Sequence, residues 1–172
     1  LDEAIPYKLS PLKIKCFDKN KKIKESLAFN DVSLIRSSSK IAKIKIEVNN
    51  KTRIEEFLGD GCLIATPAGS SAYNLSLRGP VIPVGAKVLA LTPISPFRPR
   101  RWRGALLTND AKITLYAIDS KLRPVRAEAD FMQFENIDRL EIELERKLFV
   151  NLLFDPGHDL EERIINEQFN NS

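Results

Sequence analysis

One stretch reads Ile41-Ala42-Lys43-Ile44-Lys45-Ile46-Glu47-Val48-Asn49-Asn50, an alternation of apolar and mostly charged residues that ends in two asparagines. Such alternation is typical of a β-strand that buries one face and exposes the other to water. A pair of asparagines tolerates the positive φ angles of a tight hairpin turn. The stretch therefore predicts an antiparallel hairpin whose returning strand covers residues 52–58.

Short strands also dominate the rest of the chain. Leu12, Ile14 and Cys16 alternate with lysines ahead of a turn at residues 18–22. Further strands are predicted at residues 32–35, 62–65, 88–91, 113–118, 125–129, 140–144 and 148–154. So many short strands separated by turns predict a mainly β fold with two packed antiparallel sheets, similar to a β-sandwich.

Only two helices are predicted. A short one covers residues 70–77 and is ended by Gly79-Pro80. The second covers residues 159–169, because Asp159 can cap it and Glu162 follows three residues later. We expect one mainly β domain with a C-terminal helix.

Composition excludes several classes of protein. A chain of 172 residues can bury a core without a metal or a disulfide framework. Cys16 and Cys62 lack framework spacing, so we expect free thiols in a reducing, cytoplasmic compartment. The sequence has no run of about 18 apolar residues, so no membrane span is expected. The first residue is not methionine, from which we expect that residues upstream are missing.

The net charge of +4 is mild, but residues 97–103 (Phe-Arg-Pro-Arg-Arg-Trp-Arg) hold four arginines. Such a cluster can attract the phosphate of a small ligand or of nucleic acid, or it can be a solvated loop at an interface. No nucleic-acid-reading helix or aromatic RNA-binding strand accompanies it, so nucleic acid is not an expected partner.

The most specific segment reads Gly59-Asp60-Gly61-Cys62-Leu63-Ile64-Ala65-Thr66-Pro67-Ala68-Gly69-Ser70-Ser71-Ala72-Tyr73-Asn74-Leu75-Ser76. It joins an acidic glycine turn, an apolar strand, a bend at Pro67 and Gly69, and a short segment with hydroxyls and one aromatic ring. A nucleoside ligand uses groups of these kinds, since a ring stacks on a base and carboxylates accept hydrogen bonds from ribose hydroxyls.

This segment resembles the signature of the NAD kinase family, which runs close to Asp-Gly-x-x-x-x-Thr-Pro-Thr-Gly-Ser-Thr-Ala-Tyr-x-x-Ser. Other segments resemble the family too: Leu27-Ala28-Phe29-Asn30-Asp31-Val32, Leu91-Thr92-Pro93-Ile94-Ser95-Pro96, Trp102-Arg103-Gly104-Ala105-Leu106-Leu107 and Arg126-Ala127-Glu128-Ala129-Asp130. Residues 1–172 therefore resemble the carboxy-terminal, dinucleotide-binding domain of a bacterial NAD kinase.

The resemblance implies that NAD is bound by eight residues. Asn30 and Asp31 would face ribose hydroxyls, and Asp60 would sit near the nicotinamide amide, lent by a neighbouring subunit of a dimer or tetramer. The remaining implied NAD-binding residues are Ser71, Ala72 and Tyr73 at the bases, Ser76 one turn further along, and Asp130 at a strand end on the ligand side.

The chain departs from the family at four places. Asp31 stands where the family has glutamate and has a shorter reach. Ser71 replaces threonine, Ala68 removes a hydroxyl, and Leu77-Arg78 replaces small residues. Taken alone, each candidate also fits a structural role: Asn30-Asp31 an ordinary turn, Asp60-Gly61 a hairpin bend, and Tyr73 a core residue.

The resemblance also implies what catalysis requires. NAD kinases move the terminal phosphate of ATP, with a divalent cation such as Mg²⁺, to the 2′-hydroxyl of the adenosine ribose of NAD, which gives NADP. The family's aspartate for this step lies in a Gly-Gly-Asp-Gly loop of an amino-terminal α/β domain, and the sequence contains no Gly-Gly pair. We therefore expect no catalytic residue here and no activity from this chain alone.

The histidine, cysteine and acidic residues of the sequence form no cluster with the spacing of a metal site. His158, the single histidine, fits a turn after Asp155-Pro156-Gly157. Two alternatives remain open at this point. One is a non-catalytic module that binds NAD or NADP. The other, a lipid kinase relative, is disfavoured by the Thr-Pro-Ala-Gly-Ser-Ser-Ala-Tyr segment.

Overall fold

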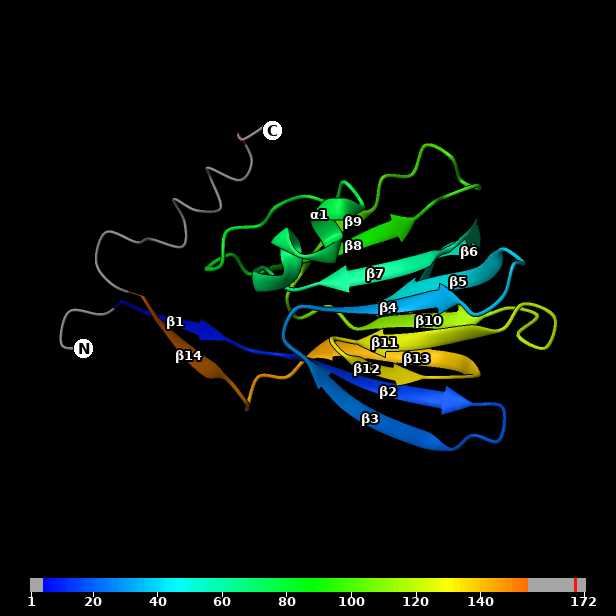
Figure 1. Cartoon of the computed structure of the whole chain (residues 1–172), viewed down its shortest axis with the longest axis horizontal. Helices are drawn as coiled ribbons and strands as arrows, with labels where there is room; N and C mark the ends of the chain where they lie inside the picture. Colours follow the sequence, from blue (N-terminus) through cyan, green and yellow to red (C-terminus); the bar gives the residue numbers. More distant parts are fainter. Residues whose placement is uncertain (1–4, 155–168, 170–172) are drawn as a thin grey trace.

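Two antiparallel sheets of six strands each pack face to face, and a separate two-stranded ribbon extends from them (Figure 1). The structure, a computed structural model, describes residues 5–154 and residue 169. The first sheet has the order β3-β2-β13-β10-β5-β6, and the second has the order β12-β11-β4-β7-β8-β9. The ribbon pairs β1 with β14. The mainly β, two-sheet prediction is confirmed.

The strands and helical turns have the following bounds: β1 Ile5–Leu9, β2 Leu12–Asp18, β3 Ile23–Ala28, β4 Asp31–Arg36, β5 Ala42–Val48, β6 Lys51–Gly59, β7 Gly61–Ala65, the 3₁₀ helix η1 Ala68–Ser71, α1 Tyr73–Ser76, β8 Val88–Ile94, β9 Ala105–Thr108, β10 Ile113–Ala117, β11 Val125–Ala129, β12 Met132–Phe134, β13 Ile137–Leu144 and β14 Val150–Phe154.

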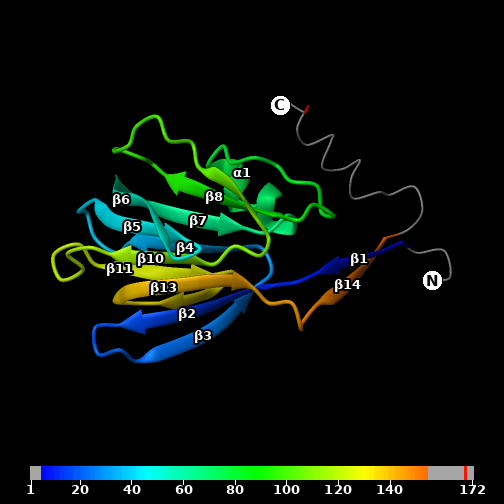
Figure 2. The ribbon, with the colours of Figure 1, turned by 180° about the vertical axis from the view of Figure 1, so that it is seen from behind.

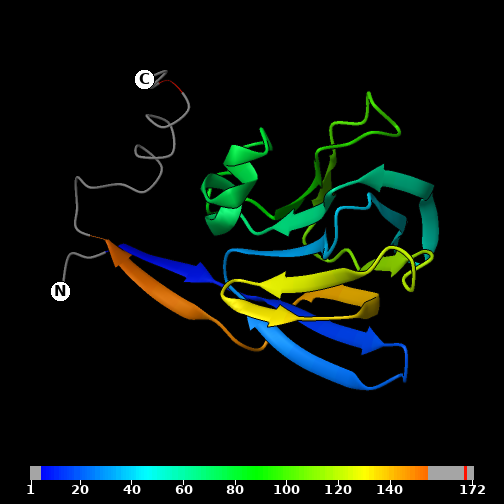
Figure 3. The same ribbon diagram turned by 45° about the vertical axis from the view of Figure 1, so that its right-hand side comes forward.

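The alternation of β5 puts Ala42, Ile44, Ile46 and Val48 into the core between the sheets. All five residues of β7 are buried, because the second sheet is covered on both faces. Its inner side chains belong to the main core, whereas Leu63 and Ala65 join a second cluster with Ile82. The helical turns η1 and α1 and the loop after them lie over the outer face of the second sheet (Figure 3), where Ile82 of this segment belongs to the second cluster and Leu77 packs against it.

The predicted β5–β6 hairpin is confirmed. Asn49 and Asn50 have φ angles of 53° and 58°, as a tight hairpin turn of this kind requires. The Asn49 side chain also accepts a hydrogen bond from the Lys112 amide at 2.9 Å, which ties the turn to the start of β10.

The strands predicted from the alternation of apolar and polar residues did not include β1, β3, β9 and β12. Three of them are edge strands of the two large sheets, and β1 belongs to the ribbon. Edge strands bury little on either face, as the mostly exposed pattern of β3 shows, so their sequences carry no clean alternation. The predicted helix at residues 159–169 falls outside the described residues, apart from Phe169.

The predicted helix at residues 70–77 is only partly correct. It is split at Ala72, whose φ of −88° and ψ of −128° are not helical, into the 3₁₀ turn η1 and the single α-helical turn α1. Within residues 5–154 and 169, no helix is long and apolar enough to cross a membrane.

The β1–β14 ribbon leaves the body of the molecule, as two opposite views show (Figures 1 and 2). Several of its large apolar side chains are open to solvent, among them Leu153 at 56% exposure and, just before β14, Leu148 at 52%. A two-stranded ribbon is marginally stable by itself in water. It therefore offers an apolar surface with no cover among the described residues.

The turn at Asn50 gives a first prediction. Replacing Asn50 by valine forces a β-branched residue to a φ of 58° and should lower the free energy of unfolding by roughly 1–2 kcal/mol. Replacing Asn50 by glycine removes that strain and should not destabilise the chain. Urea denaturation of both variants tests this, and equal stabilities would contradict the assigned turn.

Candidate functional site

Thr66, directly after β7, joins two segments that are far apart in sequence. Its hydroxyl donates to the Phe29 carbonyl at 2.6 Å and accepts from the Gly69 amide at 3.0 Å. Its own amide donates to the Asn30 carbonyl at 2.9 Å. A Cβ at residue 69 would collide with that carbonyl, so only glycine allows the two turns to lie in contact.

Asp130, at the turn between β11 and β12, fixes the same region from the other side. Its carboxylate accepts the amides of Phe29 at 2.7 Å and Asn30 at 3.0 Å, with a longer bond from Asp31 at 3.3 Å. The carboxylate thereby holds the turn between β3 and β4 in one orientation. A contact of Asp130 with a ligand stays a prediction, and its observed role is to position Asn30 and Asp31.

Five of the eight residues predicted from the sequence keep polar side-chain groups that make no hydrogen bond to another described residue. They are Asn30, Asp31, Ser71, Tyr73 and Ser76. Tyr73 is 41% exposed although its ring is large and apolar. Exposed Ala72 stands between the two short helices. The structure thus leaves these groups available to an external partner.

Burial raises the pKa of Asp31 to about 6, and the nearby charges of Asp130 and Glu128 add to this effect. Desolvation and like charges both disfavour an ionised carboxyl group. Asp31 is therefore a carboxylate that lacks donors and would be stabilised by any ligand that supplies them.

Asp60 lies at the opposite end of β7 from Thr66, and six residues of extended chain place it roughly 20 Å away. Arg36 Nε donates to its carboxylate at 2.6 Å, and both side chains are 36% exposed. The charge of Asp60 nevertheless acts on Tyr73. Partial burial first, and then the charges of Glu128, Asp31 and Asp60, raise the pKa of the Tyr73 hydroxyl.

Tyr73 therefore stands over a polar strip on the outer face of the second sheet. Val32 and Ala127 point into the core, so the alternating positions Asp31, Arg126 and Glu128 point outward. Arg126 Nε donates to Glu128 at 2.7 Å. The strip carries acidic groups whose charge is partly balanced by arginines, and it passes from Asp31 toward Asp60.

Sequence reasoning missed Arg36, Arg126 and Glu128 as members of this strip. The signal for Arg126 and Glu128 was the alternation of charged residues with small apolar ones in Arg126-Ala127-Glu128-Ala129, which marks an outer face, whereas Arg36 carried no such signal. It also missed Thr66 as the residue that joins the two turns.

Asn74 holds the Tyr73 segment from inside. It is fully buried, accepts a hydrogen bond from the Thr92 hydroxyl at 2.6 Å and donates to the carbonyls of Ser70 and Pro80. The Ser70 amide is not available to a ligand, because it donates to the Pro67 carbonyl at 3.2 Å.

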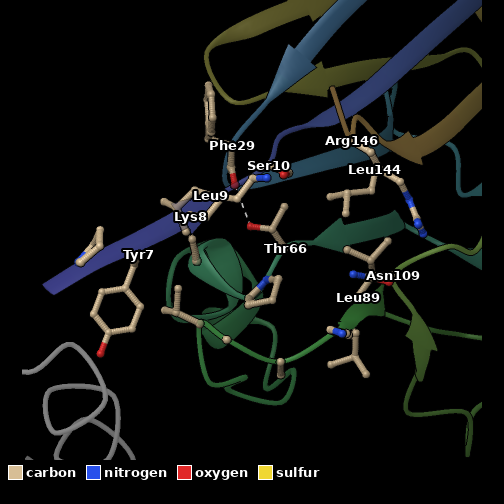
Figure 4. A pocket seen from close by; sticks show the side chains of 18 residues that line it. Tyr7, Lys8, Leu9, Ser10, Phe29, Thr66, Leu89, Asn109, Leu144 and Arg146 are labelled. Atoms are coloured by element: carbon tan, nitrogen blue, oxygen red, sulfur yellow. Dashed lines mark hydrogen bonds between the residues drawn. The ribbon is translucent and has the colours of Figure 1, made fainter. Parts of the chain in front are cut away.

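A cavity of about 500 Å³ lies on the other side of Thr66 (Figure 4). Figure 4 shows Lys8 and Ser10 of the β1 side, Thr66, and Asn109 around it. None of the eight predicted residues is among the described residues that line it. In the described part of the chain, no group of three or more histidine, cysteine or acidic residues could hold a metal ion.

Residues 29–128 match the family model described as ATP-NAD kinase C-terminal domain. The chain belongs to this family. The matched range contains the turn at Asn30, the Thr66–Gly69 turn, Tyr73 and most of the outer polar strip.

The relatives point the same way. The chain is 47% identical over 161 residues to an NAD kinase of Hyphomonas neptunium and covers 94% of its own length but 63% of that protein. It is 48% identical over 169 residues to an NAD kinase of Xylella fastidiosa, covering 98% of this chain and 65% of that one. The chain thus spans less than two thirds of these curated relatives.

Solved structures share the fold. The yeast NADH kinase complexed with NADH superposes with a TM-score of 0.86 at 24% identity, over 98% of this chain and 50% of that chain. An NAD kinase from Archaeoglobus fulgidus in complex with ATP gives a TM-score of 0.71 at 19% identity, over 93% and 60%. At these identities the likeness establishes the fold alone.

The Thr66 contacts give a second prediction. Thr66→Val keeps the shape of the side chain and removes the hydroxyl that bonds Phe29 and Gly69, so it should cost about 2 kcal/mol of unfolding free energy. Thr114→Val, on β10 and without a side-chain hydrogen bond to the described residues, serves as control and should cost little. Equal losses in chemical denaturation would contradict the role of Thr66.

The raised pKa of Asp31 gives a third prediction. The folded-state pKa lies above the unfolded value of 3.8, so the folded chain binds the extra proton and wild-type stability should fall as pH rises from 4 through 6. Asp31→Asn removes this cost. After allowance for partial exposure, the variant should be about 1 kcal/mol more stable at pH 7.5 and no more stable than wild type at pH 4. A gain that is independent of pH would contradict the shift.

Proposed function

We propose that this chain is the dinucleotide-binding part of an NAD kinase. The intact enzyme moves the terminal phosphate of ATP to the 2′-hydroxyl of the adenosine ribose of NAD and makes NADP. One observation carries the proposal. Free polar groups of Asn30, Asp31, Ser71 and Tyr73 lie on the segments joined at the Thr66–Gly69 turn, and all four fall within the residues that match the family model.

The chemistry of each group fits a nucleoside. The Asp31 carboxylate, which lacks hydrogen-bond donors, accepts hydrogen bonds from ribose hydroxyls. These bonds offset the desolvation and the repulsion by like charges that raise its pKa. Asn30 supplies both a donor and an acceptor beside it. The exposed ring of Tyr73 stacks on a base. Ser71 and Ser76 supply hydroxyls, and Ala72 leaves room for the base between them.

In this proposal Asp60 binds the nicotinamide end of NAD. It lies at the far end of β7, where Arg36 orients its carboxylate. In a homo-oligomer, a dimer or a tetramer, the Asp60 of one subunit would face the nicotinamide amide bound by its neighbour. The partial exposure of this ion pair supports such a contact.

In this proposal the phosphate donor binds to another part of the enzyme. ATP and its Mg²⁺ would be held by a part of the enzyme outside this chain, together with the aspartate that takes the proton from the 2′-hydroxyl. Among the described residues, no group of three or more histidine, cysteine or acidic residues could hold a metal ion. The greater length of the relatives and the uncovered apolar ribbon support a missing part that packs on β1 and β14.

Buried thiols support a cytoplasmic location. Burial raises the pKa of the Cys16 thiol to about 11, and Cys62 is fully buried, so neither is reactive and neither forms a disulfide. Free cysteines of this kind fit a reducing compartment.

Calorimetric titration of the 172-residue chain with NAD tests the pocket. Tyr73→Ala should weaken binding by about 5- to 150-fold, the equivalent of losing 1–3 kcal/mol of base stacking. Asp31→Asn should weaken binding while it stabilises the fold at pH 7.5. The control Leu122→Ala, an exposed apolar residue at another surface, should bind as wild type does.

Unchanged NAD affinity in both site variants would remove the pocket assignment. A separate assay with ATP, Mg²⁺ and NAD decides where the donor site lies. We expect no NADP from the chain alone, and turnover by this chain would contradict the missing donor part. A non-catalytic binding module remains the competing function, and it requires that the full-length protein bind NAD and yet make no NADP.

A further inference from the structure

The arginine-rich segment at residues 97–103 borders a cavity that the proposed function does not use. The cavity has a volume of about 620 Å³ and opens at the side of the sandwich where the edge strands β6 and β9 end the two sheets. Trp102 and Pro99 of the segment line it together with residues of both edge strands. Neither Tyr73 nor Asp60 belongs to it.

Apolar side chains make up most of its wall. Ile54 comes from the first sheet, Leu91 and Leu107 come from the second, and the indole of Trp102 closes one side. Leu106, which also lines the cavity, is 57% exposed. Ile54, Trp102 and Leu107 also pack against the main core, so the cavity continues the sandwich interior toward solvent. A volume of this size is typical of small-molecule sites.

Hydrogen bonds and close packing fix this wall. The amides of Phe97 and Arg98 donate to the Leu58 carbonyl at 2.8 and 3.1 Å, and the Leu58 amide donates to the Arg98 carbonyl at 2.8 Å. Trp102 packs edge-on against buried Phe57, with ring centroids 5.7 Å apart. Gly104, at a φ of 102°, lies against the Leu91 carbonyl where a Cβ would collide. The cavity is therefore preformed.

Among the described residues that line the cavity, Arg53 is charged and none is acidic. The segment that supplies Trp102 also carries Arg98, Arg100, Arg101 and Arg103, all exposed. Guanidinium groups bind carboxylate and phosphate oxygens with two parallel hydrogen bonds. An apolar cavity beside several exposed arginines that form no ion pair with the described residues complements a molecule that joins an apolar tail to an anionic head.

We propose that this cavity binds an amphipathic anion, with its apolar tail between Trp102 and Leu107 and its carboxylate or phosphate head at Arg53 and the arginines of residues 97–103. The site is separate from the candidate dinucleotide site and does not depend on the proposed function. The concave, ligand-sized shape favours a small molecule over nucleic acid, which would need a longer basic surface.

Trp102 is the sole tryptophan of the chain and reports directly on the site. The test titrates the 172-residue chain with 10-bromodecanoate, whose terminal bromine quenches indole fluorescence on contact. We expect saturable quenching that unbrominated decanoate reverses by competition. Decyl phosphate should compete as decanoate does. Decyltrimethylammonium, with the same tail and a positive head, should compete at least 10-fold more weakly.

Two variants separate the head from the tail. Arg53→Ala should weaken decanoate binding about 5- to 10-fold, whereas Lys121→Ala, the same loss of charge at a distant exposed loop, should not change it. Ala105→Phe fills the cavity from β9 and should abolish quenching without a loss of NAD affinity. No quenching, equal competition by the cationic and anionic tails, or undiminished quenching in Ala105→Phe would each overturn the proposal.

Discussion

The close approach of two turns at Gly69 is the constraint on which the candidate site depends. The chain after β7 can lie on the Asn30 backbone only because residue 69 has no Cβ, and Thr66 and Asp130 then hold the two turns with hydrogen bonds to backbone groups. These contacts join parts of the chain that are up to about a hundred residues apart. With the backbone amides and carbonyls so occupied, the side chains of Asn30, Asp31 and Tyr73 are left facing outward.

Much of the fold could be predicted because the core strands bury one face and expose the other. The alternation of β5 and the two asparagines after it specified a strand and a turn that the structure contains. Edge strands such as β3 carried no such signal, since neither of their faces is fully buried. The split of the short helix at Ala72 was equally hidden, because it accompanies a buried hydrogen bond between Asn74 and Thr92, eighteen residues apart.

The candidate site was partly predictable. Of the residues named from the family resemblance, Asp31 lies close enough to Tyr73 for its charge to raise the pKa of the Tyr73 hydroxyl. The sequence did not predict which polar groups form hydrogen bonds or ion pairs within the fold. Asp130 is occupied by backbone amides, and Asp60 is paired with Arg36, because strand register placed those partners opposite them. A ligand site is thus defined as much by what tertiary pairing leaves free as by residue type.

Amide hydrogen exchange of the 172-residue chain, with and without NAD, tests the central claim most directly, since it locates contact along the backbone. The account predicts slower exchange at residues 29–31 and 69–73 when NAD is added, with no comparable change in the ribbon of β1 and β14 or at residues 97–103. Protection confined to the ribbon or to residues 97–103, with residues 29–31 and 69–73 unaffected, would contradict it.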